Sequence, residues 1–468
     1  MILAKEVKDA VSGSILKGEE DFLFSGISLD SRKIKEGELF WAIKGERFDG
    51  HDFVLNAIKR GAGGAVIDER HAEAVVSNVK EEAVIISVKD TLYALGDIAR
   101  YWRKKHNPKV IAITGSSGKT TTKELLSTIL SLRYNTLRNP GNYNNLIGLP
   151  ISLLRLNSYH SIAVLEMGMN MPGEISRLTE IADPDIGIIT NIGPVHLEGV
   201  KDIEGVARAK AELAEKISKD GIIFVNGDNE LLLKEVLKFG KKVITFGKDK
   251  KNDIILEKAY FNKEMGIDFC MIWNNKKFQF RLNSFGLQNA MNAMIASAVA
   301  LYLGISEKDI IEGLLSYKGA KGRFQLINLV NDSILIDDTY NSNPLSLKAA
   351  VDSLRYLRRG KSLIIGLGDM LELGDYSVLA HRQAAEMIAK LDPDLFIAMG
   401  DFSEEMIRSA KECGIKEENL FLAKDHIDMA LEIERRVKRS KNCLVFLKAS
   451  RAILLNKVAE YLVDKLGT

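Results

Sequence analysis

Short apolar runs alternate with amphipathic stretches along most of the chain. Runs such as 110–113 and 162–165 consist of aliphatic side chains, mostly β-branched, with no polar residue inside them. Such runs are typical of strands buried on both faces of a parallel sheet, and the amphipathic stretches between them predict crossover helices. Further strands are expected at 27–32, 39–43, 65–67, 84–88, 186–190, 333–338, 363–367, 395–399 and 443–447, and helices at 50–61, 90–103 and 202–218.

One segment departs from this alternation. Residues 254–282 contain runs in which apolar and polar side chains alternate with a period of two, separated by Asn, Lys and Gly. This pattern is typical of antiparallel strands with one solvated face. We therefore expect a small antiparallel appendix on a parallel sheet.

The chain is too long for a single hydrophobic core, since it has 468 residues. Residues 105–108 are a plausible linker, and a third block of strands begins after 318. The predicted fold class is α/β with three domains, 1–105, 106–318 and 319–468. The central domain is expected to have a parallel sheet like that of P-loop ATPases, and the C-terminal domain a Rossmann-like sheet.

Composition and charge exclude several classes of protein. The net charge of +2 favours neither nucleic acid nor an anionic membrane surface as a partner. The longest apolar stretch, 293–303, is too short to span a bilayer, and the N-terminus lacks a signal-peptide pattern. Three widely spaced cysteines form no metal-binding pattern and are expected to be reduced core thiols, so we expect a cytoplasmic protein.

The most informative motif follows the apolar run 110–113. The segment Gly115-Ser116-Ser117-Gly118-Lys119-Thr120-Thr121 lies between a predicted strand and a predicted helix. The free backbone N–H groups of a helix N-terminus and a glycine turn make an anion site, Lys119 can reach phosphates, and the Thr120 hydroxyl can bind Mg²⁺. Ile113 stands where the common phosphate-loop pattern has glycine. The loop therefore indicates ATP, and ordinary kinases and GTPases are disfavoured.

Polar residues follow two other strands of the same predicted sheet. Glu166 ends the run 162–165, and His196 lies shortly after 186–190. Because the carboxyl ends of parallel strands share one edge of a sheet, Lys119, Glu166 and His196 should lie near one another. Glu166 is the expected Mg²⁺ ligand. His196 alone could equally be a structural histidine.

Several weaker features gain meaning only in combination. Asp30-Ser31-Arg32 and the cluster 44–51 suit a phosphorylated ligand, although solvated turns would be the preferred explanation if these clusters stood alone. Lys210, in an alanine-rich helix, could simply be solvated. Asn289 and Asn292 share one helical face and could bind a base edge. The strand ends at 338–344, 366–374 and 448–451 suggest half of a cleft.

In their order along the chain, these motifs resemble the Mur ligases of peptidoglycan synthesis. The resemblance covers nearly the whole chain, with two departures: Gln288 stands where the family often has histidine, and Ser342 where it often has alanine. The motifs that carry it are Asp30-Ser31-Arg32, Asp49-Gly50-His51, the phosphate loop, 139–145, Glu166-Met-Gly-Met, His196, Lys210, Gly322-Arg323-Phe324, 340–344 and 368–374.

The resemblance implies a reaction and the residues that take part in it. The first domain would bind the UDP end of a UDP-muramoyl tripeptide, the second would bind ATP, and the third would close over both. The tripeptide carboxylate would become an acyl phosphate, which the amine of D-alanyl-D-alanine would attack. Implied catalytic residues are Lys119, Glu166, His196 and Lys210. Implied ATP contacts are Gly115, Ser116, Ser117, Gly118, Lys119, Thr120, Thr121, Asn289, Asn292, Arg323 and Asp338. Implied UDP contacts are Ser31, Arg32, Asp49, Gly50 and His51, and implied peptide contacts are Asn144, Tyr340, Asn341 and Asn343.

Two Mg²⁺ ions are implied, with ligands from Thr120, Glu166, His196 and Lys210. Lys210 matches a lysine that the family converts to a carbamate with CO₂, which replaces a cation by an anion able to bind metal. A monomer is the expected state. Two alternatives stay open. The first is another amide ligase such as folylpolyglutamate synthase, and Asp30-Ser31-Arg32 and Asp49-Gly50-His51 argue against it. The second is a nucleotide-dependent switch, and Lys210 and the third-domain cleft argue against that. The sequence leaves open whether the third peptide residue is diaminopimelate or lysine.

Overall fold

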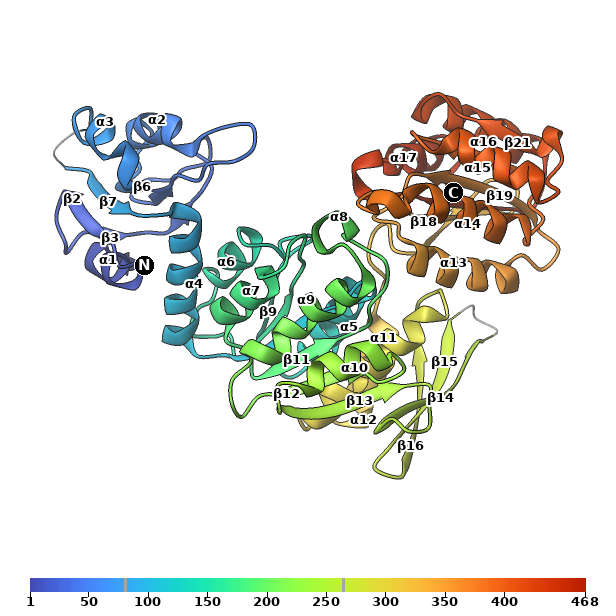
Figure 1. Cartoon of the computed structure of the whole chain (residues 1–468), viewed down its shortest axis with the longest axis horizontal. Helices are drawn as coiled ribbons and strands as arrows, with labels where there is room; N and C mark the ends of the chain where they lie inside the picture. The colour runs from blue at the N-terminus through green and yellow to red at the C-terminus, as the bar shows by residue number, and fades with distance from the viewer. Residues whose placement is uncertain (80–81, 263–265) are drawn as a thin grey trace.

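The computed structural model describes residues 1–79, 82–262 and 266–468. Within these residues the larger sheets define three bodies, which follow one another in chain order (Figure 1). We call them the N-terminal, central and C-terminal bodies. Helix α4 (Thr91–His106) leads from the first to the second. The α/β fold class is confirmed, whereas the exact domain limits near 105 and 318 stay predictions.

The N-terminal body has a sheet with the strand order β2-β7-β6-β5-β4, parallel except for β2. Successive side chains of β5, β6 and β7 enter apolar clusters on opposite faces of the sheet, which explains their uninterrupted apolar sequences. Its elements are β1 (Ile2–Leu3), α1 (Ala4–Ala10), β2 (Ser14–Lys17), β3 (Leu23–Phe24), β4 (Ile27–Ser28), β5 (Leu39–Trp41), η1 (Gly50–Phe53), α2 (Val54–Lys59), β6 (Gly64–Asp68), η2 (Glu69–His71), α3 (Ala72–Val76) and β7 (Val84–Val88).

The strand expected at 27–32 was predicted too long. It ends at Ser28, because the Asp30 carboxylate accepts hydrogen bonds from the backbone N–H and the side chain of Arg32 and closes a local turn. The expectation of three core thiols was also wrong in part, since Cys413 is exposed.

The central body contains the sheet β16-β15-β14-β13-β12-β11-β8-β10-β9. Strands β8 to β14 pair in parallel, and β15 is antiparallel to its neighbours β14 and β16, which confirms the predicted appendix. Helices α5, α11 and α12 cover one face, and α4, α6, α7, α9 and α10 pack on the other. The elements are β8 (Lys109–Thr114), α5 (Lys119–Leu130), β9 (Thr136–Arg138), α6 (Gly148–Leu153), β10 (Ile162–Glu166), α7 (Glu174–Ala182), β11 (Ile186–Ile189), α8 (Leu197–Val200), α9 (Ile203–Lys216), β12 (Ile222–Asn226), α10 (Glu230–Leu237), β13 (Lys242–Gly247), β14 (Ile254–Phe261), β15 (Ile267–Trp273), β16 (Lys276–Leu282), α11 (Gln288–Tyr302) and α12 (Glu307–Ser316).

The C-terminal body has the sheet β17-β18-β22-β19-β20-β21, parallel except for β17. Helices α13, α14 and α15 pack on one face and α16 and α17 on the other, as expected for a Rossmann-like sheet. The elements are β17 (Gln325–Leu329), β18 (Ser333–Asp338), α13 (Pro344–Leu357), β19 (Ser362–Gly368), η3 (Gly374–Tyr376), α14 (Ser377–Ala389), β20 (Leu395–Met399), α15 (Ser403–Glu412), η4 (Glu417–Asn419), β21 (Leu420–Leu422), α16 (His426–Arg439), β22 (Cys443–Lys448), η5 (Arg451–Ile453) and α17 (Asn456–Leu466).

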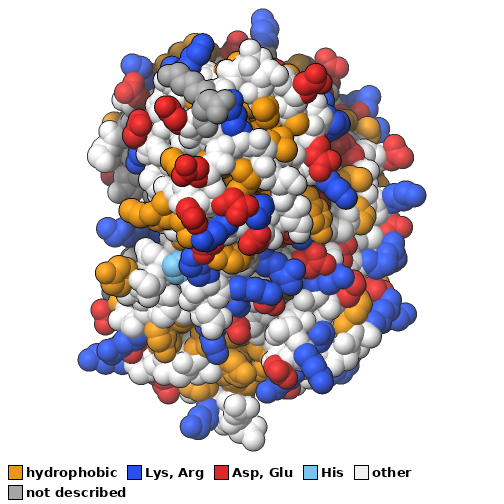
Figure 2. All heavy atoms as spheres, turned by 90° about the vertical axis from the view of Figure 1, so that its left-hand side faces the viewer, with side chains coloured by type: hydrophobic (Ala, Val, Ile, Leu, Met, Phe, Trp, Pro, Cys, Tyr) orange, Lys and Arg blue, Asp and Glu red, His pale blue; other side chains and the backbone are white. Residues whose placement is uncertain are grey.

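The surface agrees with the small net charge. Figure 2 shows the face on the side of the N-terminal body, where acidic and basic side chains are interspersed with apolar ones. A search of the described residues finds no helix with the length and hydrophobicity needed to cross a membrane.

Candidate active site

The phosphate loop connects β8 to α5, and its two glycines are required by its geometry. Gly115 and Gly118 have φ angles of +141° and +81°. A Cβ atom at Gly115 would lie 2.1 Å from Thr190 Oγ1, and one at Gly118 would lie 2.4 Å from Asn292 Oδ1. Backbone conformation and close packing therefore both exclude other residues from these positions.

Residues at the end of β11 hold the loop in place. Asn191 accepts hydrogen bonds from the backbone N–H groups of Ser116, at its carbonyl, and of Ser117, at Oδ1, each 2.9 Å long. The Thr190 hydroxyl donates to the Ser117 carbonyl at 2.6 Å. Sequence reasoning missed Thr190 and Asn191 as loop partners, although Thr190 ends a predicted strand and Asn191 directly follows it.

Lys119 and Thr120 begin α5 at the predicted edge of the sheet. The Lys119 amine donates to the Gly115 carbonyl at 2.7 Å, across the loop. Burial lowers the pKa of Lys119, the charge of Glu166 opposes that shift, and the charge of Arg323 adds to it. A ligand with several negative charges would reverse the shift.

Glu166 is the centre of a hydrogen-bonded cluster at the end of β10. Its carboxylate accepts hydrogen bonds from the Thr120 hydroxyl and the Asn144 amide, each at 2.9 Å. Lys123 Nζ, whose side chain is fully buried, lies 3.7 Å from Glu166 Oε2 and donates to the Asn139 carbonyl at 2.8 Å. Sequence reasoning did not single out Lys123, although its position four residues after Lys119 puts both side chains on one face of α5.

Lys210 is completely buried in α9. Its Nζ has no hydrogen-bond partner in the part of the chain that the structure describes. Burial and the charge of Lys119 lower the pKa of Lys210 well below its ordinary value. The solvated-lysine interpretation is therefore wrong, because the side chain is shielded from solvent and its lowered pKa favours the neutral amine.

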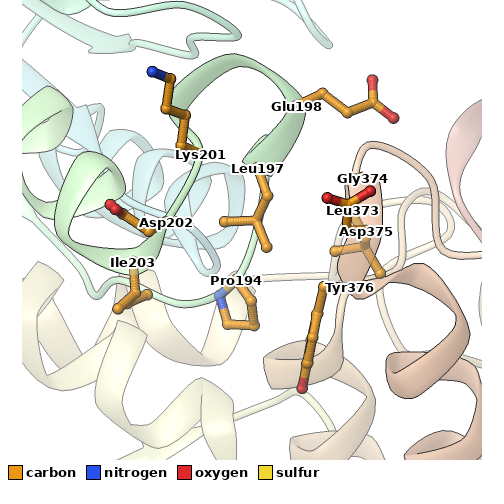
Figure 3. A pocket seen from close by; sticks show the side chains of 10 residues that line it. All are labelled: Pro194, Leu197, Glu198, Lys201, Asp202, Ile203, Leu373, Gly374, Asp375 and Tyr376. Carbon is orange, nitrogen blue, oxygen red and sulfur yellow. The ribbon is translucent and has the colours of Figure 1, made fainter.

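His196 lies just before α8 and contacts the C-terminal body. Its Nδ1 is 2.5 Å from Glu372 Oε2, and the nearby imidazole lowers the pKa of Glu372. The motif 368–374 was noted in the sequence, but nothing there pointed to Glu372 as the partner of His196. The residues that directly follow them in the chain, Leu197 and Leu373, line a cleft of about 880 Å³ between α8 and the segment before α14 (Figure 3).

The C-terminal body reaches the phosphate loop directly. Arg323 Nη2 donates to Thr120 Oγ1 at 3.3 Å, and its guanidinium lies 4.0 Å from the centre of the Tyr340 ring. Asn343 Nδ2 donates to the Ser116 carbonyl at 3.5 Å. Asn341 and Asn343 line a small cavity together with residues 116–121. The structure thus joins the predicted nucleotide and peptide residues of two bodies.

Asp338 is engaged within its own body. Lys448 Nζ lies 2.5 Å from Asp338 Oδ2, and the Phe324 N–H donates to Oδ1 at 3.1 Å. Burial raises the pKa of Asp338 and lowers that of Lys448. Both carboxylate oxygens already have partners, so Asp338 positions Arg323 and Phe324 at the start of β17.

A cavity of about 510 Å³ extends from the phosphate loop along α11. Asn292 lines it and donates to Asn289 Oδ1 at 3.1 Å, while Asn289 donates to the Phe285 carbonyl at 2.6 Å. Of the two asparagines, Asn292 is the one that faces the space available to a base. Gln288, one of the departures from the family pattern, also lines this cavity.

The residues predicted to bind UDP all belong to the N-terminal body, in two segments, 31–32 and 49–51. The exposed Arg32 pairs with Asp30, and Ser31 is buried. His51 Nδ1 lies 2.6 Å from Asp49 Oδ1, and His51 Nε2 accepts the Asp68 N–H at 3.0 Å. Both ring nitrogens of His51 are therefore engaged, so this histidine shapes the loop that carries Asp49 and Gly50.

Comparison with known protein families gives matches in all three bodies. The models described as "Mur ligase family, catalytic domain", "Mur ligase middle domain" and "Mur ligase, glutamate ligase domain" match residues 23–103, 113–300 and 322–451.

Full-length relatives and solved structures agree with these matches. The chain is 33% identical to the UDP-N-acetylmuramoyl-tripeptide–D-alanyl-D-alanine ligase of Bacillus subtilis over 98% of both chains. It is 32% identical to the Escherichia coli ligase of the same name over 96% of this chain and 97% of that one. A crystal structure of MurF from Acinetobacter baumannii superposes with a TM-score of 0.89 at 32% identity, covering 99% of this chain and 98% of that one. MurF from Thermotoga maritima in complex with ADP superposes with a TM-score of 0.83 at 28% identity, covering 96% and 99%.

Proposed function

The chain belongs to the Mur ligase family, and on that premise we propose that it is an ATP-dependent ligase that joins D-alanyl-D-alanine to a UDP-N-acetylmuramoyl-tripeptide. The product would be the pentapeptide precursor of peptidoglycan. The observation that carries the chemistry is the contact of Arg323 with Thr120, because it brings a cation of the C-terminal body onto the phosphate loop. A site shared by two bodies suits a reaction that must bring ATP and two peptide substrates close together.

Phosphoryl transfer depends mainly on positioning and charge neutralisation. Lys119 and Arg323 would neutralise the phosphate charge while the γ-phosphate passes to the tripeptide carboxylate and ADP leaves. The dipeptide amine would then form the amide bond, release phosphate and lose a proton. Asn292 would contact the adenine, and Asn144, Tyr340, Asn341 and Asn343 would border the peptide.

Two features of this chain fit a divalent cation. The Thr120 hydroxyl and the Glu166 carboxylate are oxygen ligands of the kind Mg²⁺ prefers. His196 lies in the segment that connects β11 to α8. Lys210 is a buried, unpartnered amine with a lowered pKa, and its reaction with CO₂ would give a carbamate anion and a proton. When bound, Mg²⁺ would neutralise charge on the phosphates. We propose Thr120 and Glu166 as ligands of one Mg²⁺ ion, His196 as a ligand of a second, and carbamylated Lys210 as a further metal ligand.

The UDP end of the substrate would bind the N-terminal body at Ser31, Arg32, Asp49 and Gly50, with His51 supporting the loop. Arg32 would exchange its local partner Asp30 for a phosphate, since bidentate guanidinium contacts favour phosphate oxygens. The protein is proposed to act as a monomer in the cytoplasm, where ATP is available.

The test is phosphate release from ATP and Mg²⁺, with UDP-muramoyl tripeptide and D-alanyl-D-alanine added separately and together. Release only with both substrates, with the pentapeptide product identified by its mass, is expected. Comparing diaminopimelate and lysine tripeptides would identify the third residue. Release with a folate and glutamate instead would overturn the proposal, and release without any acceptor would favour a nucleotide switch.

A further inference from the structure

A cavity of about 530 Å³ lies between the N-terminal and central bodies, beside the end of α4. Its walls come from residues near β1 and β4 of the N-terminal body, from the last turns of α4 and from the end of α6 with the segment that follows it. Helix α4 stands between the two bodies (Figure 1). The volume lies within the range of pockets that bind small molecules.

The cavity is at the edge of the central sheet opposite to the candidate active site. Helix α4 ends at His106, shortly before β8, and the lining residues 156–158 precede β10. The phosphate loop and Glu166 are at the carboxyl ends of the same two parallel strands. A six-residue strand spans about 20 Å. None of the residues that line the cavity is among those proposed to bind ATP, UDP or the peptide.

The apolar walls of the cavity are fixed by contacts of their own. Leu156 is buried, and its carbonyl accepts a hydrogen bond from Trp102 Nε1 at 2.9 Å. The His106 ring packs edge-on against the Trp102 ring, with the ring centres 4.7 Å apart. Ile27 and Leu29 form part of the opposite wall. The walls are therefore already formed, and an apolar group can occupy the cavity without rearranging them.

The polar side chains of the cavity leave positive charge available. Among the described residues that line it there is no Asp or Glu, whereas Lys105, His106 and Arg155 all line it. The Lys105 charge is compensated, since its Nζ lies 2.6 Å from Glu6 Oε1. Arg155 is exposed and has no ion-pair partner in the part of the chain that the structure describes. His106 Nε2 is buried and has no hydrogen-bond partner there either.

From this combination we propose that the cavity is a binding site, separate from the active site, for a small apolar molecule that carries one carboxylate. Its apolar part would leave water against Leu29 and Trp102, which is favourable in proportion to the area buried. Its carboxylate would pair with Arg155, because guanidinium and carboxylate groups form strong charge-assisted hydrogen bonds. An oxygen of the same group is the kind of acceptor that His106 Nε2 lacks. The proposal does not depend on the ligase reaction.

A water-filled packing gap between two bodies is the competing explanation. Such a gap has no reason to distinguish an anion from a cation or a neutral molecule of the same length. The proposed site does distinguish them, because its uncompensated charge is positive and its walls offer no carboxylate. Binding of matched ligands that differ only in charge therefore separates the two explanations.

The first arm of the test is ¹⁹F NMR of the full chain labelled with 5-fluorotryptophan. The chain has three tryptophans, of which Trp102 lines the cavity, and Trp102→Phe assigns its signal. Octanoate, octylammonium and 1-octanol are titrated separately, below the concentrations at which they form micelles. We expect octanoate to shift the Trp102 signal most, with a Kd of about 1 mM or below, and the other two to bind more weakly. An unshifted Trp102 signal with octanoate, or equally tight binding of octylammonium or 1-octanol, would overturn the proposal.

The second arm measures octanoate affinity in variants by calorimetry. Arg155→Ala should weaken binding roughly tenfold, and Arg155→Lys should retain most of the affinity. Because Arg155 is exposed, the melting temperature of Arg155→Ala should match that of the wild type. The matched control is Arg100→Ala, which removes the same charge from an exposed position of α4 that does not line the cavity. Equal losses of affinity in Arg155→Ala and Arg100→Ala would contradict a built carboxylate site.

Discussion

Around the phosphate loop, three buried or half-buried lysines have different partners. Lys119 donates to the Gly115 carbonyl, and Lys123 donates to Asn139 and lies near Glu166. Lys210 has no hydrogen-bond partner among the described residues. The three lysines therefore differ in what surrounds the amine: a backbone carbonyl of the phosphate loop, a carbonyl and a nearby carboxylate, or no polar partner at all.

This difference gives a prediction for Lys210. Replacing Lys210 by Ala should abolish most ligase activity, and formate or acetate should restore part of it by taking the place of the carbamate. Lys123→Ala is the matched control, because it removes a buried cation and a small carboxylate cannot replace it. Phosphate release measured with and without added formate or acetate tests this prediction. Full activity of Lys210→Ala would contradict the proposal that Lys210 is carbamylated.

The buried pair of Lys448 and Asp338 gives a prediction for stability. Lys448→Met should leave an unpaired carboxylate in the C-terminal body and lower its unfolding free energy by about 3–5 kcal/mol. Adding Asp338→Asn should recover much of the loss, because the amide keeps an acceptor for the Phe324 N–H without a charge. Calorimetric melting of both variants tests this, and equal melting temperatures of the single and double variants would refute it.

At the scale of helices and strands, the apolar pattern predicted most of the architecture. Buried parallel strands need apolar side chains on both faces, so β6, β8 and β10 were visible as continuous runs. The pattern failed where side chains satisfy the backbone locally, as Asp30 does after β4. It also could not reveal that Asn191 holds the phosphate loop, because that contact joins segments more than seventy residues apart.

The packing of α1 on α4 gives a prediction for the dependence of stability on pH. Glu6 Oε1 accepts hydrogen bonds from Lys105 Nζ and Tyr101 Oη, both at 2.6 Å, and these lower the pKa of Glu6 from 4.5 to about 2. A lowered pKa means that the native state favours the carboxylate. The stabilisation is therefore complete above pH 4.5 and is lost as the pH falls towards 2.

Glu6→Gln should thus lower stability by about 1 kcal/mol at neutral pH, a small effect because Lys105 is partly exposed. The difference from the wild type should shrink as the pH is lowered from 5 to 3. Hydrogen exchange of the α1 amides across this range measures it. A difference that stays constant with pH would show that lost packing, not charge, is responsible.

At the scale of the whole molecule, the candidate site exists only where two bodies meet. The polar strand ends of the C-terminal domain predicted half of a cleft, and Arg323 and Asn343 do reach the phosphate loop. The pairing of His196 with Glu372 could not be predicted, because it depends on how two separate bodies pack against each other. Such contacts leave no periodic signal in the sequence.

Because Arg323 belongs to the C-terminal body and contacts the phosphate loop, closure of that body should affect catalysis through Arg323. Arg323→Ala should lower kcat/KM roughly 10²- to 10³-fold, because it removes a cation from the developing phosphate charge. Its melting temperature should change little, since the lost contacts are one 3.3 Å hydrogen bond and a ring contact with Tyr340. Arg359→Ala is a close control, because Arg359 lies the same 4.0 Å from the ring centre of Tyr356 and has no contact with the phosphate loop among the described residues. If the two substitutions lower the melting temperature and the activity by similar amounts, Arg323 acts through packing. If only Arg323→Ala loses activity, the charge of Arg323 contributes to the reaction.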